Sequence, residues 1–315
     1  MIHTPYDGSA KPFTIGLKPL DIREWIESDG NLGAYLAEKK RLYTDDWFNV
    51  FAAVDGTDDA QAEVLELLIA YLPQRFPEVY RMDAGVMHIT PPHRHPGEGR
   101  GVAMIAVDVG SNKPVPGLRR DDVPLAIAGQ LVQEDLVIMG RSPEGWRLAA
   151  ASLCFPSAWN LRDKIGKPMH GVHQPVPGFG EGTRNAGLIE RMFDNLRVEQ
   201  PVIRWNWTVF GEATLHLPAS ENSMVRRFGD GEIAEHVFLR LERQTLRKLP
   251  RSGEILFTIR THVNPAEILQ AHPEGPFLAR ALIAQVLALT SEELAYKGLT
   301  HERDRLVAKL GTFTA

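Results

Sequence analysis

The sequence predicts an α+β fold, in which antiparallel strands are bracketed by helices. Two neighbouring segments, 237–246 and 254–263, alternate apolar and polar residues with the period of a β-strand. The turn-like sequence 248–253 between them predicts a hairpin. Further along, Thr-Ser-Glu-Glu at 290–293 has the spacing of a helix capping box. Strands and helices do not alternate regularly, which argues against a doubly wound parallel sheet.

The helices are predicted where apolar residues recur every three or four positions between capping and terminating residues. The clearest one starts after Asp58 and Asp59, either of which could cap it, and is expected to end at Pro73. The expected helical segments are two short pieces within 21–43, then 58–72, 124–134, 188–196, 276–289 and 290–296.

The remaining strands are expected at 102–109, 136–139, 146–155, 202–210 and 214–217. Residues 1–20 contain three prolines and are expected to form an extended arm, and the Gly/Pro/His-rich region 82–100 is expected to be a loop. No linker-like change of composition divides the chain, so a single domain is expected.

The composition is that of a globular protein: 315 residues, 43% of them hydrophobic and 24% charged. The net charge of -5 provides no basic field for nucleic acid or an anionic membrane. A single cysteine excludes an internal disulfide framework and a cysteine-rich zinc or iron–sulfur site. No apolar run approaches the ~20 residues of a membrane-spanning helix, and the polar residues 1–9 do not have the apolar core of a signal peptide. A cytoplasmic protein is expected.

The central segment 153–180 contains Cys154, His170, His173 and four prolines, which rule out a long helix. An imidazole on such a constrained backbone suits a metal or cofactor ligand, although a structured loop with satisfied histidines is the simpler interpretation. His173 is followed by Gln-Pro-Val-Pro-Gly and is the better fixed of the two histidines. Cys154 follows an apolar strand, where a lone cysteine is usually a small core residue.

The first hairpin strand places Arg243 on the same face as Leu239, Leu241 and Thr245. An unpaired arginine on an apolar face is costly, so either an ion pair or a ligand is expected to hold it.

The sequence lacks a Walker phosphate loop, a serine nucleophile elbow and a dinucleotide-binding glycine motif after a strand. The loop containing His88, His93, His95 and Glu98 has ligand types that suit iron, zinc or copper. Its order resembles the first metal motif of cupins but departs from it in the His-to-Glu spacing. A solvated polar loop is the alternative interpretation.

Several segments together resemble the haem-dependent oxidative N-demethylase α-subunit family over about residues 60–300. They are 125–136 (LAIAGQLVQEDL), 154–168 (CFPSAWNLRDKIGKP), 171–180 (GVHQPVPGFG), the WNW sequence at 205–207, 238–263 (FLRLERQTLRKLPRSGEILFTIRTHV) and 294–299 (LAYKGL). The region 88–98 departs from the family pattern. The resemblance implies a PAS-like haem-binding core over 58–265, with an antiparallel sheet, helices on one side and a b-type haem between them. Residues 1–57 and 266–315 would be helical additions.

The resemblance also implies an activity. Haem iron would activate O2 to oxidise a small methylated secondary amine, such as dimethylamine, and release formaldehyde. Electrons would come from NADPH through partner subunits that carry flavin and an iron–sulfur cluster. This chain has neither the cysteines nor the nucleotide motifs for those tasks.

Carried onto this sequence, the resemblance makes His173 the expected proximal haem ligand, with Cys154 as the alternative. Arg243, or Arg240 on the other face of the same strand, would hydrogen-bond dioxygen or a haem propionate. Glu242 and Gln244 are further catalytic candidates, and Trp205 and Trp207 would pack the pocket wall.

Three competing functions stay open on the sequence. One is a haem-based gas sensor without turnover, although no coiled-coil output segment is present. Another is a non-haem metal oxygenase that uses His88, His93, His95 and Glu98. The third is a scaffold that has kept the fold and lost the cofactor.

Overall fold

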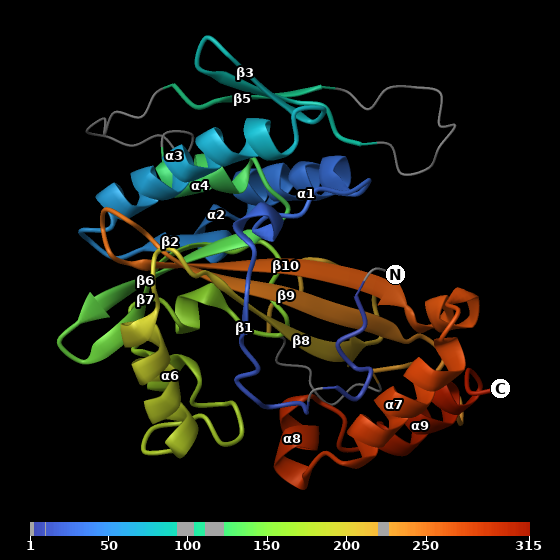
Figure 1. Cartoon of the computed structure of the whole chain (residues 1–315). Helices are drawn as coiled ribbons and strands as arrows, with labels where there is room; N and C mark the ends of the chain where they lie inside the picture. Colours follow the sequence, from blue (N-terminus) through green and yellow to red (C-terminus); the bar gives the residue numbers. More distant parts are fainter. Residues whose placement is uncertain (1–2, 10, 93–103, 111–122, 220–226) are drawn as a thin grey trace.

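A seven-stranded antiparallel sheet forms the centre of the computed structural model, which describes residues 3–9, 11–92, 104–110, 123–219 and 227–315. In spatial order, its strands are β1 (Lys18–Pro19), β8 (Val202–Phe210), β9 (Phe238–Lys248), β10 (Ile255–Pro265), β6 (Asp135–Ser142), β7 (Gly145–Ser152) and β2 (Phe51–Ala53). Figure 1 shows this sheet between two layers of helices. The predicted α+β class and the hairpin of β9 and β10 are confirmed.

The two faces of the sheet carry different side chains, and we name them after two adjacent residues of β9. The Glu242 face also carries Arg240, Gln244 and Leu246, and the pairing register adds Arg204 and Asn206 of β8 to it. The Arg243 face carries Leu241 of β9, and the register adds Trp205 and Trp207 of β8 and Arg260 and His262 of β10. The alternation predicted for Leu239, Leu241, Arg243 and Thr245 is therefore confirmed.

Helices from the N-terminal part of the chain cover the Arg243 face. They are η1 (Ile22–Glu24), α1 (Leu32–Asp45), α2 (Trp47–Val50), α3 (Asp58–Arg75) and α4 (Pro124–Gly129). Leu136, Ile138 and Leu256 of the sheet share one apolar core with residues of α1, α3 and α4. Beyond this layer lies a three-stranded sheet of β3 (Tyr80–Asp83), β4 (Val86–Ile89) and β5 (Ile105–Asp108), as Figure 1 shows.

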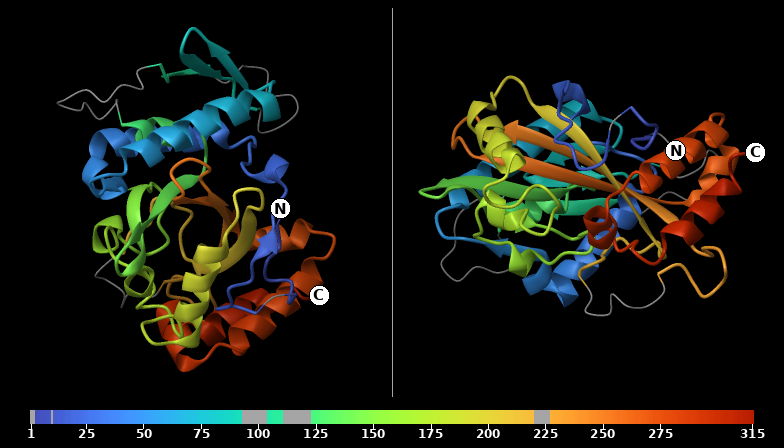
Figure 2. Two further views of the ribbon diagram at one scale, coloured as in Figure 1. Left: turned by 60° about the vertical axis from the view of Figure 1, so that its left-hand side comes forward. Right: turned by 90° about the horizontal axis from the view of Figure 1, so that it is seen from below.

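Residues 153–196 cover the Glu242 face with η3 (Leu161–Asp163), α5 (Met169–Val172) and α6 (Arg184–Asn195). Their apolar side chains pack on Val137, Leu246 and Ile259 of the sheet. The chain ends in η4 (Ala266–Ala271), α7 (Gly275–Leu287), α8 (Ser291–Tyr296) and α9 (Arg303–Gly311), which Figure 2 shows gathered at one end of the sheet. Both faces are thus covered by helical segments, whereas helices on one side were expected.

The predicted capping box is present, since Thr290 Oγ1 accepts from the backbone of Glu293 and the Glu293 carboxylate accepts from the backbone of Thr290. The expected end of α3 at Pro73 was wrong, because the helix continues to Arg75. A proline in the last turn removes a single N–H donor, and the helix ends two residues later. The expected cap was also wrong: Asp58 and Asp59 lie in the first turn and Thr57 is the N-cap residue.

Three other boundaries differ from the predictions for local reasons. The expected loop 82–100 contains the end of β3 and all of β4, because its prolines lie after β4 and Gly85 only forms the turn between the two strands. The expected helix 124–134 ends at Gly129, which lies so close to the hydroxyls of Tyr43 and Ser152 that a Cβ atom would collide with both. The expected strand 214–217 forms only an isolated bridge from Leu217 to Ser157, and the carbonyls of Thr214 and Leu215 accept from Arg240 instead.

In the described part of the chain, no helix combines the length and the apolar character that crossing a membrane requires.

Candidate functional site

His173 lies at the C-terminal end of the one-turn helix α5, which begins directly after Pro168. Proline suits this position because a helix start needs no N–H there. The ring Nδ1 atom of His173 lies 3.1 Å from the carbonyl oxygen of Met169. A carbonyl only accepts, so Nδ1 carries the proton and Nε2 keeps its lone pair. The sequence indicated a fixed imidazole, but it did not predict this short helix.

Burial lowers the pKa of His173 to about 4, and the positive charges of Arg204 and Lys164 lower it further, while the hydrogen bond to Met169 opposes them. Lys164 also donates to the carbonyl of Val172 and so fastens the end of α5. His173 is therefore neutral at neutral pH, with Nε2 free of a proton. This is the state in which an imidazole binds a metal.

Arg204 of β8 supplies positive charge close to His173. The sequence did not predict it as a site residue. Its Nη2 atom donates to the carbonyl of Thr14 at 3.2 Å. Its Nε atom is buried and has no hydrogen-bond partner among the described groups. Burial lowers the pKa of Arg204, and the carboxylate of Glu242 opposes that effect. Strand register could have indicated this residue, because Arg204 pairs directly with Gln244.

Glu242 is the buried acceptor at the centre of the same face. Its carboxylate accepts from Ser157 Oγ, from Asn206 Nδ2 at 3.2 Å and from Gln244 Nε2 at 2.8 Å. The predicted candidates Glu242 and Gln244 are thus brought together in one hydrogen-bonded group. The sheet therefore presents a buried carboxylate and a buried guanidinium towards the segment that carries His173.

Lys297, directly after α8, adds a second buried cation. Its Nζ atom donates to the carbonyl of Trp207 at 2.8 Å. Burial lowers its pKa to about 8, while the carboxylate of Glu242 raises it. Its aliphatic chain places the ammonium group 5.1 Å from the ring centre of Phe13. The site therefore combines one carboxylate with two cations that burial has made less basic.

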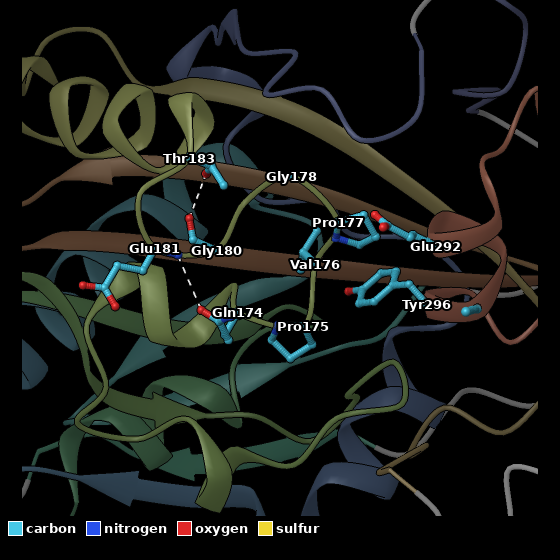
Figure 3. Close-up of a pocket in the computed structure, with 11 residues that line it drawn as sticks. Gln174, Pro175, Val176, Pro177, Gly178, Gly180, Glu181, Thr183, Glu292 and Tyr296 are labelled. Carbon is cyan, nitrogen blue, oxygen red and sulfur yellow. Dashed lines mark hydrogen bonds between the residues drawn. The ribbon is translucent and has the colours of Figure 1, made fainter.

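The loop that follows His173 in the chain lines a cavity of about 660 Å³. Figure 3 shows the loop 174–180 facing Glu292 and Tyr296 of α8 across this cavity. The loop is braced by hydrogen bonds from Thr183 Oγ1 to the carbonyl of Gly180, at 2.8 Å, and from the backbone of Glu181 to Gln174 Oε1. His173 itself is not among the lining residues. The volume falls within the roughly 300–1,000 Å³ of small-molecule and cofactor sites.

The two arginines predicted from the sequence, Arg240 and Arg243, bind to other groups of the protein. Arg240 is on the Glu242 face but makes five hydrogen bonds to residues of the protein: to the carbonyls of Phe155, Pro156, Thr214 and Leu215 and to Ser157 Oγ. Arg243 is on the opposite face and donates to the carbonyls of Glu24 and Trp25. Its Nε atom lies 3.5 Å from Glu27 Oε1. The ion pair expected for Arg243 is thus formed by Glu27.

The two tryptophans also point to the Arg243 face. The ring of Trp205 lies 4.1 Å from that of His3, and Trp207 Nε1 donates to Gln285 Oε1 at 2.9 Å. Neither side chain shares a face with Glu242.

Cys154 is buried in a cluster with Tyr35, Leu42, Tyr43 and Phe155. Burial raises the pKa of its thiol, which is therefore neutral. His88 lies on β4 with a buried Nδ1 atom that has no partner among the described groups. His93, His95 and Glu98 lie outside the described residues, so the metal loop stays a prediction.

A comparison with protein families adds one finding to this geometry. The family described as "Haem-dependent oxidative N-demethylase, alpha subunit-like" matches residues 16–307.

Proposed function

The chain belongs to the haem-dependent oxidative N-demethylase alpha-subunit-like family, and on this premise we propose that it is a haem-dependent oxidoreductase that removes a methyl group from a small secondary amine. The single observation that carries the proposal is the imidazole of His173, whose Nδ1 atom is held by the Met169 carbonyl. A neutral imidazole with a free Nε2 atom would hold a haem iron through that nitrogen.

The surrounding residues fit a haem. The buried Nε atom of Arg204 has no partner among the described groups, and a propionate carboxylate would satisfy it. Residues 174–180 leave a cavity next to the proposed ligand. A b-type haem would supply the iron that activates dioxygen. His173 is preferred to Cys154 as the ligand, because Cys154 lies in a separate buried cluster with Tyr35, Tyr43 and Phe155.

The residues of the Glu242 face would bind and orient the amine substrate. A protonated secondary amine is a small cation, and the buried carboxylate of Glu242 attracts and orients such a group. Gln244 and Asn206 hold that carboxylate in place through their hydrogen bonds. Arg240 acts as a positioning residue, because its Nε atom donates to Ser157 Oγ, which in turn donates to Glu242.

Arg243 and Trp205 lie on the other face of the sheet. Trp207 also lies on that face, but its ring and its carbonyl support Lys297. Arg243 instead anchors the segment before α1.

The alpha-subunit description of the family implies a partner subunit. In the proposal, reductase subunits with flavin and an iron–sulfur cluster deliver electrons from NADPH. We further propose that the central strands form a PAS-like core and that the protein is cytoplasmic.

Haem reconstitution tests the proposal. The wild-type protein is expected to show a Soret band, and His173→Ala is expected to change the axial-ligand spectrum. His170→Ala is the matched control, because His170 lies three residues away on α5. Amine-dependent NADPH oxidation and formaldehyde release with a reductase would establish the enzyme. A wild-type protein that binds haem without such turnover would be a gas-binding protein, and a colourless one would refute the proposal.

A further inference from the structure

Three ligand-type side chains from distant parts of the chain meet on the Arg243 face, on the other side of the sheet from His173. His3 comes from the N-terminal arm, Glu27 from the segment between η1 and α1, and His262 from β10. His3 Nε2 lies 2.7 Å from Glu27 Oε1, and His262 Nε2 lies 2.9 Å from Glu27 Oε2. Among the described residues, this is the only group of three or more His, Cys, Asp or Glu side chains with ligand atoms within 4.8 Å of one another.

We propose that His3, Glu27 and His262 bind a divalent transition-metal ion of the zinc class. Imidazole nitrogens and a carboxylate are the ligands that Zn²⁺ takes at about 2.0–2.2 Å. Both imidazoles already direct Nε2 at the same carboxylate, so small shifts of the rings would admit an ion between them. Because a carboxylate only accepts, each Nε2 atom carries a proton in its hydrogen bond to Glu27. Binding of the ion would move that proton to Nδ1 of the same ring or release it to solvent.

The surrounding contacts hold these ligands in place. The backbone N–H of Glu27 donates to Glu134 Oε1 at 3.0 Å. Arg243 fixes the preceding residues by donating to the carbonyls of Glu24 and Trp25. The ring of Trp205 packs against His3. Partners of this kind, outside the ligands themselves, orient the ligands of protein metal sites.

The charge balance of the region is compatible with a bound cation. Arg243 lies close to Glu27, but its guanidinium also has two carbonyl partners and does not depend on that carboxylate. Arg260 is neutralised by Asp29, with 2.8 Å between Nη2 and Oδ2.

The side chains of His3, Glu27 and His262 are 24%, 22% and 15% exposed, so an ion can reach them from solvent. Three protein ligands leave at least one coordination position for water or a small ligand, as in catalytic rather than structural zinc sites. We therefore expect an exchangeable ion that EDTA removes.

Titration of the full-length, metal-free protein with Co²⁺ tests the inference, because Co²⁺ in a nitrogen and oxygen site absorbs in the visible region. One equivalent is expected to bind with new absorption bands, and Zn²⁺ is expected to displace it. Glu27→Gln, His262→Ala and His3→Ala are each expected to weaken binding at least about ten-fold. The matched control is His272→Ala, since His272 is a half-buried histidine outside the cluster.

His3→Ala protects the test against a folding defect, because this residue lies on the arm and a native circular dichroism spectrum is expected to persist. His173→Ala is expected to bind Co²⁺ like the wild type, which separates this site from the proposed haem site. Wild-type protein without visible Co²⁺ bands, or equal Co²⁺ affinity in wild type and in a folded His3→Ala variant, would overturn the inference.

Discussion

Arg240 and Arg243 lie three residues apart on β9, and their guanidinium groups bind to opposite layers of the molecule. Arg240 holds the carbonyls of residues 155–156 and 214–215 on the Glu242 face. Arg243 holds the carbonyls of Glu24 and Trp25 on the other face. One strand therefore fastens both covering layers to the sheet, and each arginine can be tested separately.

Replacing Arg240 by lysine is expected to destabilise the fold by about 3 kcal/mol. A lysine has three donors in place of the five of a planar guanidinium, and the abandoned carbonyls of Phe155 and Pro156 are buried. Urea unfolding of the haem-free protein measures this change. Arg184→Lys, at an exposed position of α6, serves as control with little effect. A loss below about 1 kcal/mol for Arg240→Lys would contradict a structural role.

Replacing Gly129 by alanine is expected to cost roughly 3 kcal/mol or more of unfolding free energy. The added Cβ atom would collide with the hydroxyls of Tyr43 and Ser152, which are 2.5 Å apart and buried. Gly311→Ala is the matched control, because a Cβ atom there meets nothing within 4 Å. Thermal unfolding of both variants compares them. Partial recovery of stability is expected when Tyr43→Phe is added to Gly129→Ala, because the Ser152 hydroxyl still meets the new Cβ atom. No recovery at all would point to another cause.

The pKa of His173, lowered from 6.5 to about 4, predicts a pH dependence of stability. Between these values the unfolded chain binds the proton more readily than the folded protein. Stability is therefore lost as the pH falls from about 6.5 to about 4, by at most about 3 kcal/mol from this group. Unfolding free energies of haem-free wild type and His173→Asn, measured across this window, isolate the effect. A difference between them that does not change with pH would refute it.

Replacing Glu242 by glutamine is expected to raise KM for the amine at least about ten-fold while the Soret band keeps its position. The amide removes the negative charge but keeps the shape and the hydrogen-bond acceptor for Ser157. Glu181→Gln, on an exposed carboxylate at the cavity, is the control. Steady-state kinetics with a reductase partner provides the measurement. An unchanged KM in Glu242→Gln would remove this residue from substrate binding.

Local sequence patterns were enough to predict the elements whose structure depends only on residues nearby in the chain. The hairpin of β9 and β10, the faces of β9 and the capping box of α8 follow from spacing alone, and the structure confirms them. Local patterns did not predict the elements whose bounds depend on contacts with a distant segment of the chain. The carbonyl of Gly129, at the end of α4, accepts from Lys39 of α1, and the carbonyls of Thr214 and Leu215 accept from Arg240.

The same reasoning explains the candidate site. The sequence directed attention to His173 through its prolines, but the partner of its Nδ1 atom is a carbonyl of a helix too short to show a periodic pattern. Arg204 was missed because its importance depends on the register between β8 and β9. His3, Glu27 and His262 meet only through the tertiary fold, and no spacing in the sequence predicts their contact.

The two edges of the central sheet have a consequence for how the chain is made. Both edge strands, β1 and β2, come from the first 53 residues, whereas their partners β8 and β7 lie at 202–210 and 145–152. The strands that leave the ribosome first therefore stay unpaired until their distant partners in the chain have been made. Until they do, the backbone groups of β7 and β8 are unprotected edges on which a second chain could add a strand. These two pairings join segments far apart in the chain and therefore form slowly. The nascent protein depends on prompt docking of its first 53 residues, which cover both edges.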